Sequence, residues 1–270
     1  MNRLVILLDF SKYSPPLVKL AFSWKAHFNY NLVFIHEIPG LVPTLSDNNS
    51  RRQVIEYEKR QALLLFNDLL KETGNLPNEV TFLPVEKHLN HYLETFLNPE
   101  DIVLLGIKGT GFIKKFLIGS TATEIINHLN QMIIAIPPEV NCIYPEELVV
   151  GAHPNYPINS HELNRLLRNL DDQIKQVELI SFIAQKEDED KTHTYLADLK
   201  NKINKGPRIE INTFDGKDAF TQIKSYISKK PKSFFVVQKG SRTMNDILFR
   251  RFLINDLVYD GKIPLIILPS

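Results

Sequence analysis

The sequence predicts an α/β fold built as two tandem open-sheet domains, each a five-stranded parallel sheet with helices on both faces. Three observations predict this fold. Short apolar runs alternate with amphipathic stretches, the same order of elements occurs twice, and 270 residues suit one large domain or two ordinary ones. We expect the domains to cover residues 1–140 and 145–270.

The composition is that of an ordinary globular protein. Hydrophobic residues make up 43% and charged residues 23% of the chain, which excludes wholesale disorder. The 32 basic and 31 acidic residues nearly cancel, so we expect neither nucleic acid nor a membrane as a partner. A single cysteine, Cys142, makes no internal disulfide, and no apolar run suits a signal peptide or a membrane span. We therefore expect a cytoplasmic protein.

The first half alternates strands and helices. Arg3 to Phe10 is a compact apolar run, typical of a strand buried on both faces. A helix is expected from Pro15 to Asn29, since prolines are tolerated in a first turn. A second helix, residues 51–72, has apolar residues at helical spacing: Ile55, Ala62, Leu65, Phe66 and Leu69. The other expected elements are strands at 31–36, 79–85, 101–106 and 132–137, and helices at 88–98 and 121–130.

The second half repeats this order. Its expected strands are residues 147–153, 176–181, 208–212, 233–237 and 262–269. The two most similar segments are Lys114–Ser120 (KKFLIGS) and Arg250–Asp256 (RRFLIND). Their similarity at corresponding positions favours duplication of one unit. The join falls near residues 138–145, and the charged run at 186–191 is interpreted as a solvated turn.

A glycine-rich segment follows the fourth strand. Gly106, Gly109, Gly111 and Gly119 lie between the end of this strand and a predicted helix that starts near Ser120. Ligands of open parallel sheets bind beyond the carboxyl ends of the strands. Glycine lets the backbone approach a ligand closely, and the amides of a helix N-terminus attract anions. The segment therefore predicts a phosphate-binding loop.

Two common nucleotide motifs do not match this segment. A Walker loop requires Lys after its second glycine, but Phe112 follows Gly111. A dinucleotide fingerprint requires a third glycine where Lys114 stands, and it follows the first strand rather than the fourth.

The spacing Gly106-x₂-Gly109-x₉-Gly119-Ser120 resembles the nucleotide-binding loop of the universal stress protein family. The resemblance extends over the whole chain as a tandem pair, including the opening Asp9-Phe-Ser. It implies the Rossmann-like, adenine-nucleotide α-hydrolase-like fold and a site for ATP or AMP. The site residues that it implies are Asp9 beside the nucleoside and, around the phosphates, Gly106, Gly109, Gly119, Ser120, Thr121 and Thr123. Lys108 in the same loop is a further candidate for a phosphate contact.

Simpler interpretations stay open for several of these residues. The glycines are also explained by turn chemistry, and Lys108, Lys114 and Lys115 by solvation. Ser120 suits a helix N-cap, and Thr121–Glu124 has the form of a capping box. Asp9 at a strand end suits a cap on the next helix.

The second half lacks the same loop. Asn255-Asp256 stands where Gly119-Ser120 stands in the first half, and His153 takes the place of Asp9. A carboxylate about 4 Å from a phosphate costs roughly 4 kcal/mol at an effective dielectric near 20. We therefore expect one nucleotide per chain.

Catalysis and a dedicated metal site find little support. His88 and His91 share a predicted helix without a third metal ligand, and His36 at a strand end is interpreted as a satisfied core histidine. Bound ATP would bring Mg²⁺ through its phosphates. No general base is identifiable, so hydrolysis is expected to be slow at most.

The function predicted from these observations and the resemblance is a stress-response, nucleotide-sensing binding module. The alternatives are a weak ATP-hydrolysing or adenylate-forming enzyme of the same fold, and a scaffold that binds no nucleotide. In the family, chains pair through their last strands, which implies that residues 132–137 and 263–269 meet here as an intrachain pseudo-dimer. A homodimer of the whole chain is a further expectation.

Overall fold

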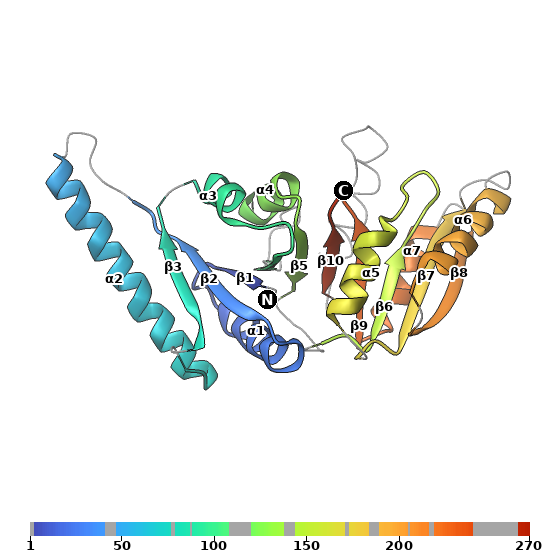
Figure 1. The fold of residues 1–270 in the computed structure, drawn as a ribbon, viewed down its shortest axis with the longest axis horizontal. Helices are drawn as coiled ribbons and strands as arrows, with labels where there is room; N and C mark the ends of the chain where they lie inside the picture. The colour runs from blue at the N-terminus through green and yellow to red at the C-terminus, as the bar shows by residue number, and fades with distance from the viewer. Residues whose placement is uncertain are drawn as a thin grey trace. The chain divides into compact units, whose positions relative to one another are not determined.

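The structure is a computed structural model. It describes residues 3–40, 47–76, 79–86, 88–107, 120–137, 144–170, 173–183, 189–204, 206–215, 219–239 and 264–270. Strands alternate with helices along most of these ranges (Figure 1), so the predicted α/β class is confirmed. None of the helices in these ranges combines the length and apolar character needed to cross a membrane.

In the part of the first compact unit that the structure describes there are four strands and four helices. The strands, in the parallel order β3-β2-β1-β4, are β1 (Arg3–Leu8), β2 (Asn31–Glu37), β3 (Thr81–Val85) and β4 (Ile102–Gly106). The helices are α1 (Ser14–Phe28), α2 (Asn48–Thr73), α3 (Leu89–Phe96) and α4 (Ser120–His128). Helix α1 packs against α2, and α3 against α4. Right-handed crossovers in this strand order place the two pairs on opposite faces of the sheet.

The second unit contains six strands and three helices among its described residues. The strands, in the order β5-β10-β9-β6-β7-β8, are β5 (Met132–Ile136), β6 (Glu147–Gly151), β7 (Gln176–Ile183), β8 (Arg208–Asp215), β9 (Ser233–Gln238) and β10 (Leu265–Leu268). The helices are α5 (Ser160–Asn169), α6 (Glu189–Lys202) and α7 (Ala219–Ser228).

Strand β5 pairs with β10 in antiparallel fashion, with Ile134 opposite Ile266, whereas the other pairings in this unit are parallel. The expected meeting of these two segments is confirmed. The domain limits of 1–140 and 145–270 stay a prediction, because a contact-defined unit is not the same as a part of the chain that folds alone.

Burial explains why the apolar runs became strands. The side chains of Leu4, Val5 and Ile6 in β1 are fully buried, as expected for a parallel strand covered on both faces. Helix α1 buries Trp24 completely and has prolines in its first turn. It ends where Asn29 adopts a left-handed conformation with φ 54°.

Three details differ from the expectations. Helix α2 begins at Asn48 rather than near residue 51, because the Asp47 carboxylate accepts hydrogen bonds from the amides of Asn49 and Ser50, each 2.8 Å long. The charged run at 186–191 is not wholly a turn, since α6 begins at Glu189. Leu65, expected on the apolar face of α2, is 52% exposed.

Candidate functional site

Two of the predicted site residues lie at the same edge of the first unit. Strand β1 pairs with β4 in parallel, with Leu7 opposite Leu105. Asp9 follows the end of β1 and Gly106 ends β4, so both lie at the carboxyl edge on strands about 4.8 Å apart. This is the edge at which parallel α/β sheets bind ligands.

The start of α4 belongs to the same edge. Helix α3 begins four residues after the end of β3, so its first turn lies at the carboxyl edge. Asn90 in this turn donates a 3.4 Å hydrogen bond to the Glu124 carboxylate of α4, which places the beginning of α4 at the same edge. The helix begins at Ser120, so Ser120, Thr121 and Thr123 are in its first turn. Lys108, Gly109 and Gly119 lie outside the described residues.

Asp9 contacts the beginning of α1. Its Oδ1 accepts hydrogen bonds from the amide of Ser11 at 2.9 Å and from the hydroxyl of Ser14 at 3.3 Å. Tyr13, the N-cap residue of α1, makes no capping bond through its side chain. Asp9 therefore contacts the segment that opens this helix through Ser11 and Ser14, while its side chain stays exposed at the sheet edge.

Gly106 is not required by the protein's own packing. A Cβ atom built at this position meets no heavy atom of the described residues within 4 Å. The backbone does not need glycine there either, because Gly106 is not among the residues with positive φ. The space beside its Cα is therefore open to another group.

Phe10 occupies an unusual backbone conformation directly after Asp9. Its φ is 51°, which is uncommon for a residue other than glycine. The ring lies against the imidazole of His36, with centroids 4.4 Å apart. The Nδ1 of His36 is 2.9 Å from the Leu8 carbonyl oxygen, which only accepts hydrogen bonds, so Nδ1 carries the proton. His36 is thus satisfied, as predicted.

Aromatic side chains continue from Phe10 toward α2. Phe10 and Phe82 have ring centroids 6.3 Å apart, and Phe82 stacks on Phe66 of α2 at 4.3 Å with an interplanar angle of 7°. Phe10 and Phe82 also pack against a buried cluster formed by Ile38, Ile55 and Ala62. The contribution of Phe10 was not predicted, because its ring position depends on the left-handed backbone.

The corresponding edge of the second unit is filled by its own side chains. His153, the counterpart of Asp9, is 5% exposed and stacks on Phe182 with centroids 4.6 Å apart and an interplanar angle of 16°. Its Nδ1 accepts a 3.2 Å hydrogen bond from the amide of Asn155. Position 153 thus holds a buried neutral ring where the first unit has an exposed carboxylate.

Gln238 closes the same edge further along the sheet. It ends β9, the counterpart of β4, and its Oε1 accepts a 2.8 Å hydrogen bond from the amide of Asn159. Its Nε2 donates to the carbonyl of Pro269 at 2.6 Å, just beyond β10. A glutamine with these bonds replaces the open glycine of the first unit.

A buried charge cluster lies elsewhere in the second unit, between β7 and the end of α7. The Glu178 carboxylate is 1% exposed, accepts hydrogen bonds from Tyr226 and Asn212, and lies 2.8 Å from the Lys230 ammonium. Burial lowers the pKa of Lys230, but the bond and charge of Glu178 outweigh burial, so this pKa lies above its ordinary value. Burial, followed by the Glu178 hydrogen bond, raises the pKa of Tyr226.

Metal ligands do not converge in the part of the chain that the structure describes: no group of three His, Cys, Asp or Glu side chains is placed to hold an ion. His88 precedes α3 in a left-handed conformation with φ 79°. The expectation that His88 and His91 share a helix is therefore wrong, because His88 lies just before α3.

Comparisons with known proteins identify the architecture. No protein-family model and no curated protein matches the sequence. A universal stress protein from Archaeoglobus fulgidus DSM 4304 superposes with a TM-score of 0.65 at 10% identity, over 99% of this chain and 98% of that one. A putative universal stress protein from Pseudomonas aeruginosa UCBPP-PA14 gives a TM-score of 0.56 at 11% identity, over 99% and 92%.

The same architecture also occurs in a different kind of protein. The cytoplasmic domain of a prokaryotic cation chloride cotransporter superposes with a TM-score of 0.51 at 9% identity, over 98% of this chain and 94% of that one. Likeness at such identities concerns fold and not activity. The chain therefore has the fold of the universal stress proteins over nearly its whole length, as the resemblance of its glycine loop predicted.

Proposed function

We propose that this protein is a stress-response, nucleotide-sensing module that binds ATP or AMP at the carboxyl edge of its first unit. The observation that carries the proposal is the open space at Gly106 beside the exposed Asp9. Neither packing nor backbone conformation requires glycine at position 106. A glycine there suits the close approach of a ligand to the backbone. The first turn of α4 supplies amides that have no partner within the helix, and a positive helix end, for phosphate.

The proposed roles follow from these positions. Asp9 faces the nucleoside, and Gly106 begins the phosphate loop. The residues assigned to the phosphates beyond Gly106 are Lys108, Gly109, Gly119, Ser120, Thr121 and Thr123. Mg²⁺ would enter with the phosphates of ATP and add charge neutralisation there.

The second unit is proposed to bind no nucleotide. Burial of His153 beneath Phe182 and closure of the edge by Gln238 support this asymmetry. A phosphate chain there would have to displace hydrogen bonds that the protein already makes. Titration calorimetry with ATP should therefore give a stoichiometry near one, and a value near two would contradict the asymmetry.

The decisive test compares two glycine variants. Gly106→Ala adds a methyl group into open space at the proposed site, and Gly206→Ala adds one into open space elsewhere. Both variants should match the wild type in melting temperature. Only Gly106→Ala should weaken ATP and AMP binding in calorimetry, by about tenfold or more, since the methyl group would occupy the space of the ligand.

Two outcomes would overturn the proposal. If the wild type carries no nucleotide by mass spectrometry and millimolar ATP leaves its melting temperature unchanged, the protein is a scaffold. The contact of Asp9 with the start of α1 favours this second candidate, because it gives the residue a structural role that needs no ligand. Equal ATP affinity in Gly106→Ala and the wild type would instead remove the site from this edge.

A further inference from the structure

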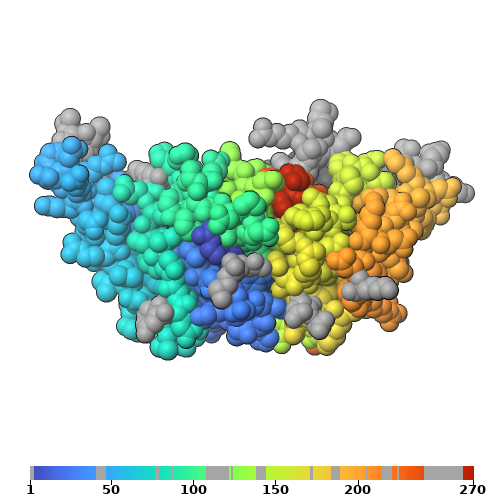
Figure 2. All heavy atoms as spheres, viewed as in Figure 1, coloured from blue at the N-terminus to red at the C-terminus, as the bar shows by residue number. Residues whose placement is uncertain are grey.

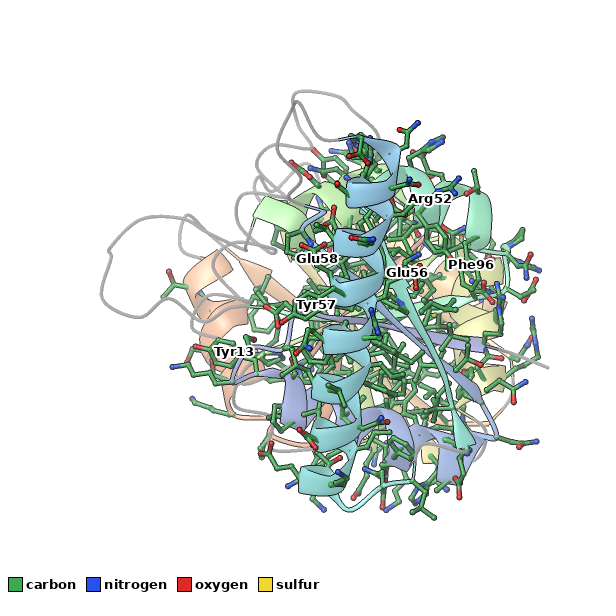
Figure 3. All side chains as sticks on the ribbon, turned by 90° about the vertical axis from the view of Figure 1, so that its left-hand side faces the viewer. Tyr13, Arg52, Glu56, Tyr57, Glu58 and Phe96 are labelled. Carbon is green, nitrogen blue, oxygen red and sulfur yellow. The ribbon has the colours of Figure 1, made fainter. Side chains whose placement is uncertain are left out.

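Helix α2 has apolar side chains on two sides, and only one side belongs to the core. Its inner side contributes five buried residues: Ile55, Ala62, Phe66, Leu69 and Leu70. Four other apolar side chains of α2 are exposed: Tyr57 (59%), Leu63 (47%), Leu64 (56%) and Leu65 (52%). Figure 3 shows α2 in front of the other elements of the first unit, with Tyr57 labelled on it. In Figure 2 the atoms of α2 form part of the surface of this unit.

The exposed apolar residues centre on one line along the helix. Tyr57 and Leu64 are seven residues apart, so they form this outer line, and Leu63 and Leu65 flank it on its two sides. Ile55 and Phe66 lie on the opposite side and pack inward. Tyr57 and Leu64 therefore face away from the core, and Leu63 and Leu65 lie between the outer line and the buried side.

The outer line is symmetric about the middle of the helix. Helix α2 runs from Asn48 to Thr73, so its midpoint falls between Arg60 and Gln61. Tyr57 and Leu64 lie at equal distances on either side of this midpoint. When a second α2 is laid antiparallel in full register, Tyr57 of each copy faces Leu64 of the other.

The charges of α2 favour the same arrangement. Residues 51–60 contain four basic and two acidic side chains, whereas residues 61–73 contain one basic and two acidic. An antiparallel pair places the more basic half of each helix beside the more acidic half of the other, and it opposes the two helix dipoles favourably. A parallel pair would place like halves together.

We infer that the outer face of α2 is a self-association surface that binds α2 of a second copy across a two-fold axis. Such an interface is isologous, because the same residues contribute from both subunits. A single helix of 26 residues is about 39 Å long and offers less area than a standard stable interface. The dimer should therefore be reversible, with a dissociation constant on the order of micromolar.

Analytical ultracentrifugation of the full chain tests the surface. The wild type should change from monomer to dimer between about 1 and 500 μM, and Leu64→Glu should weaken association at least tenfold. Leu76→Glu is the matched control, because Leu76 is 63% exposed but lies beyond the end of α2. Circular dichroism should show equal folding of all three proteins. A monomer at 500 μM, or a dimer that Leu64→Glu leaves unchanged, would overturn the inference.

Cysteine cross-linking tests the orientation. In a Cys142→Ser background, Gln61→Cys near the two-fold axis should form an intermolecular disulfide on oxidation, whereas Gln53→Cys alone should not. Efficient cross-linking of Gln53→Cys would indicate a parallel pair and overturn the arrangement. Nucleotide binding by Leu64→Glu should equal that of the wild type, so failure of this inference and failure of the proposed function are separately visible.

Discussion

The ammonium of Lys230 lies 2.8 Å from the Glu178 carboxylate, which is 1% exposed in the second unit. Lys230 also lies 3.4 Å from Glu147 and 5.1 Å from the centre of the Tyr226 ring. Removing one member of a buried pair leaves the other charge without compensation, which costs far more than the loss of a surface ion pair.

Lys230→Met should therefore destabilise the protein by about 3–5 kcal/mol in urea unfolding. Lys229→Met is the control, because Lys229 is an exposed neighbour, and it should change stability by less than about 0.5 kcal/mol. The double variant Glu178→Leu with Lys230→Met should recover only part of the loss, since no buried charge is left but Tyr226 and Asn212 lose their acceptor. A similar effect of both single lysine variants would refute the importance of the pair.

The same cluster predicts a loss of stability at alkaline pH. The pKa values of Lys230 and Tyr226 in the folded protein lie above their ordinary values of 10.5 and 10.0. The folded state therefore keeps protons that the unfolded chain releases, so stability is complete below about pH 10 and falls as the pH rises further. Urea midpoints measured from pH 7 to 11 should show this fall, and Lys230→Met should make it shallower. An equal slope in both proteins would contradict the assignment.

Gly151→Ala should destabilise the second unit. A Cβ atom at this position in β6 would lie 2.9 Å from Cζ of Phe235, so the ring must move within a packed core. Overpacking of this kind costs about 1–3 kcal/mol. Adding Phe235→Leu should restore part of the loss in thermal unfolding. Gly206→Ala, with open space around it, should be close to neutral, and an equal loss there would exclude the steric explanation.

Asp9 has a structural contact and a proposed ligand contact, and two substitutions separate them. Asp9→Asn keeps an oxygen that accepts from Ser11 and Ser14, whereas Asp9→Ala loses it. Asp9→Ala should lower stability by about 1 kcal/mol, and Asp9→Asn by much less. Calorimetry with ATP should show weaker binding for both variants if the charge contacts the nucleoside. Unchanged affinity in Asp9→Asn would leave Asp9 with only its contact to α1.

Most of the strands were predictable because they are buried apolar runs. The side chains of β1 and β5 are buried along nearly their whole length, so composition alone marks them. Boundaries were less accurate where a side chain decides them, as Asp47 does for α2. The start of α6 within a charged run was missed because Glu189 and Asp190 suit the first turn of a helix as well as a solvated loop.

The candidate site was predictable only in part. The positions of Asp9 and Gly106 at one edge follow from strand order. By contrast, the stacking of Phe10 on His36, the burial of His153 and the bonds of Gln238 depend on contacts between distant segments. Leu65 was assigned to the core because its spacing fits an apolar face, yet α2 has a second such face.

Pro84 in β3 has a consequence for solubility. Among the described residues of the first unit, no strand lies beyond β3, and Pro84 stands there in register with His36. Proline offers no amide hydrogen and is a poor template for an incoming strand, so this border of the sheet resists growth into fibrils. Pro84→Thr would restore the missing donor and make the chain more prone to aggregate through that border.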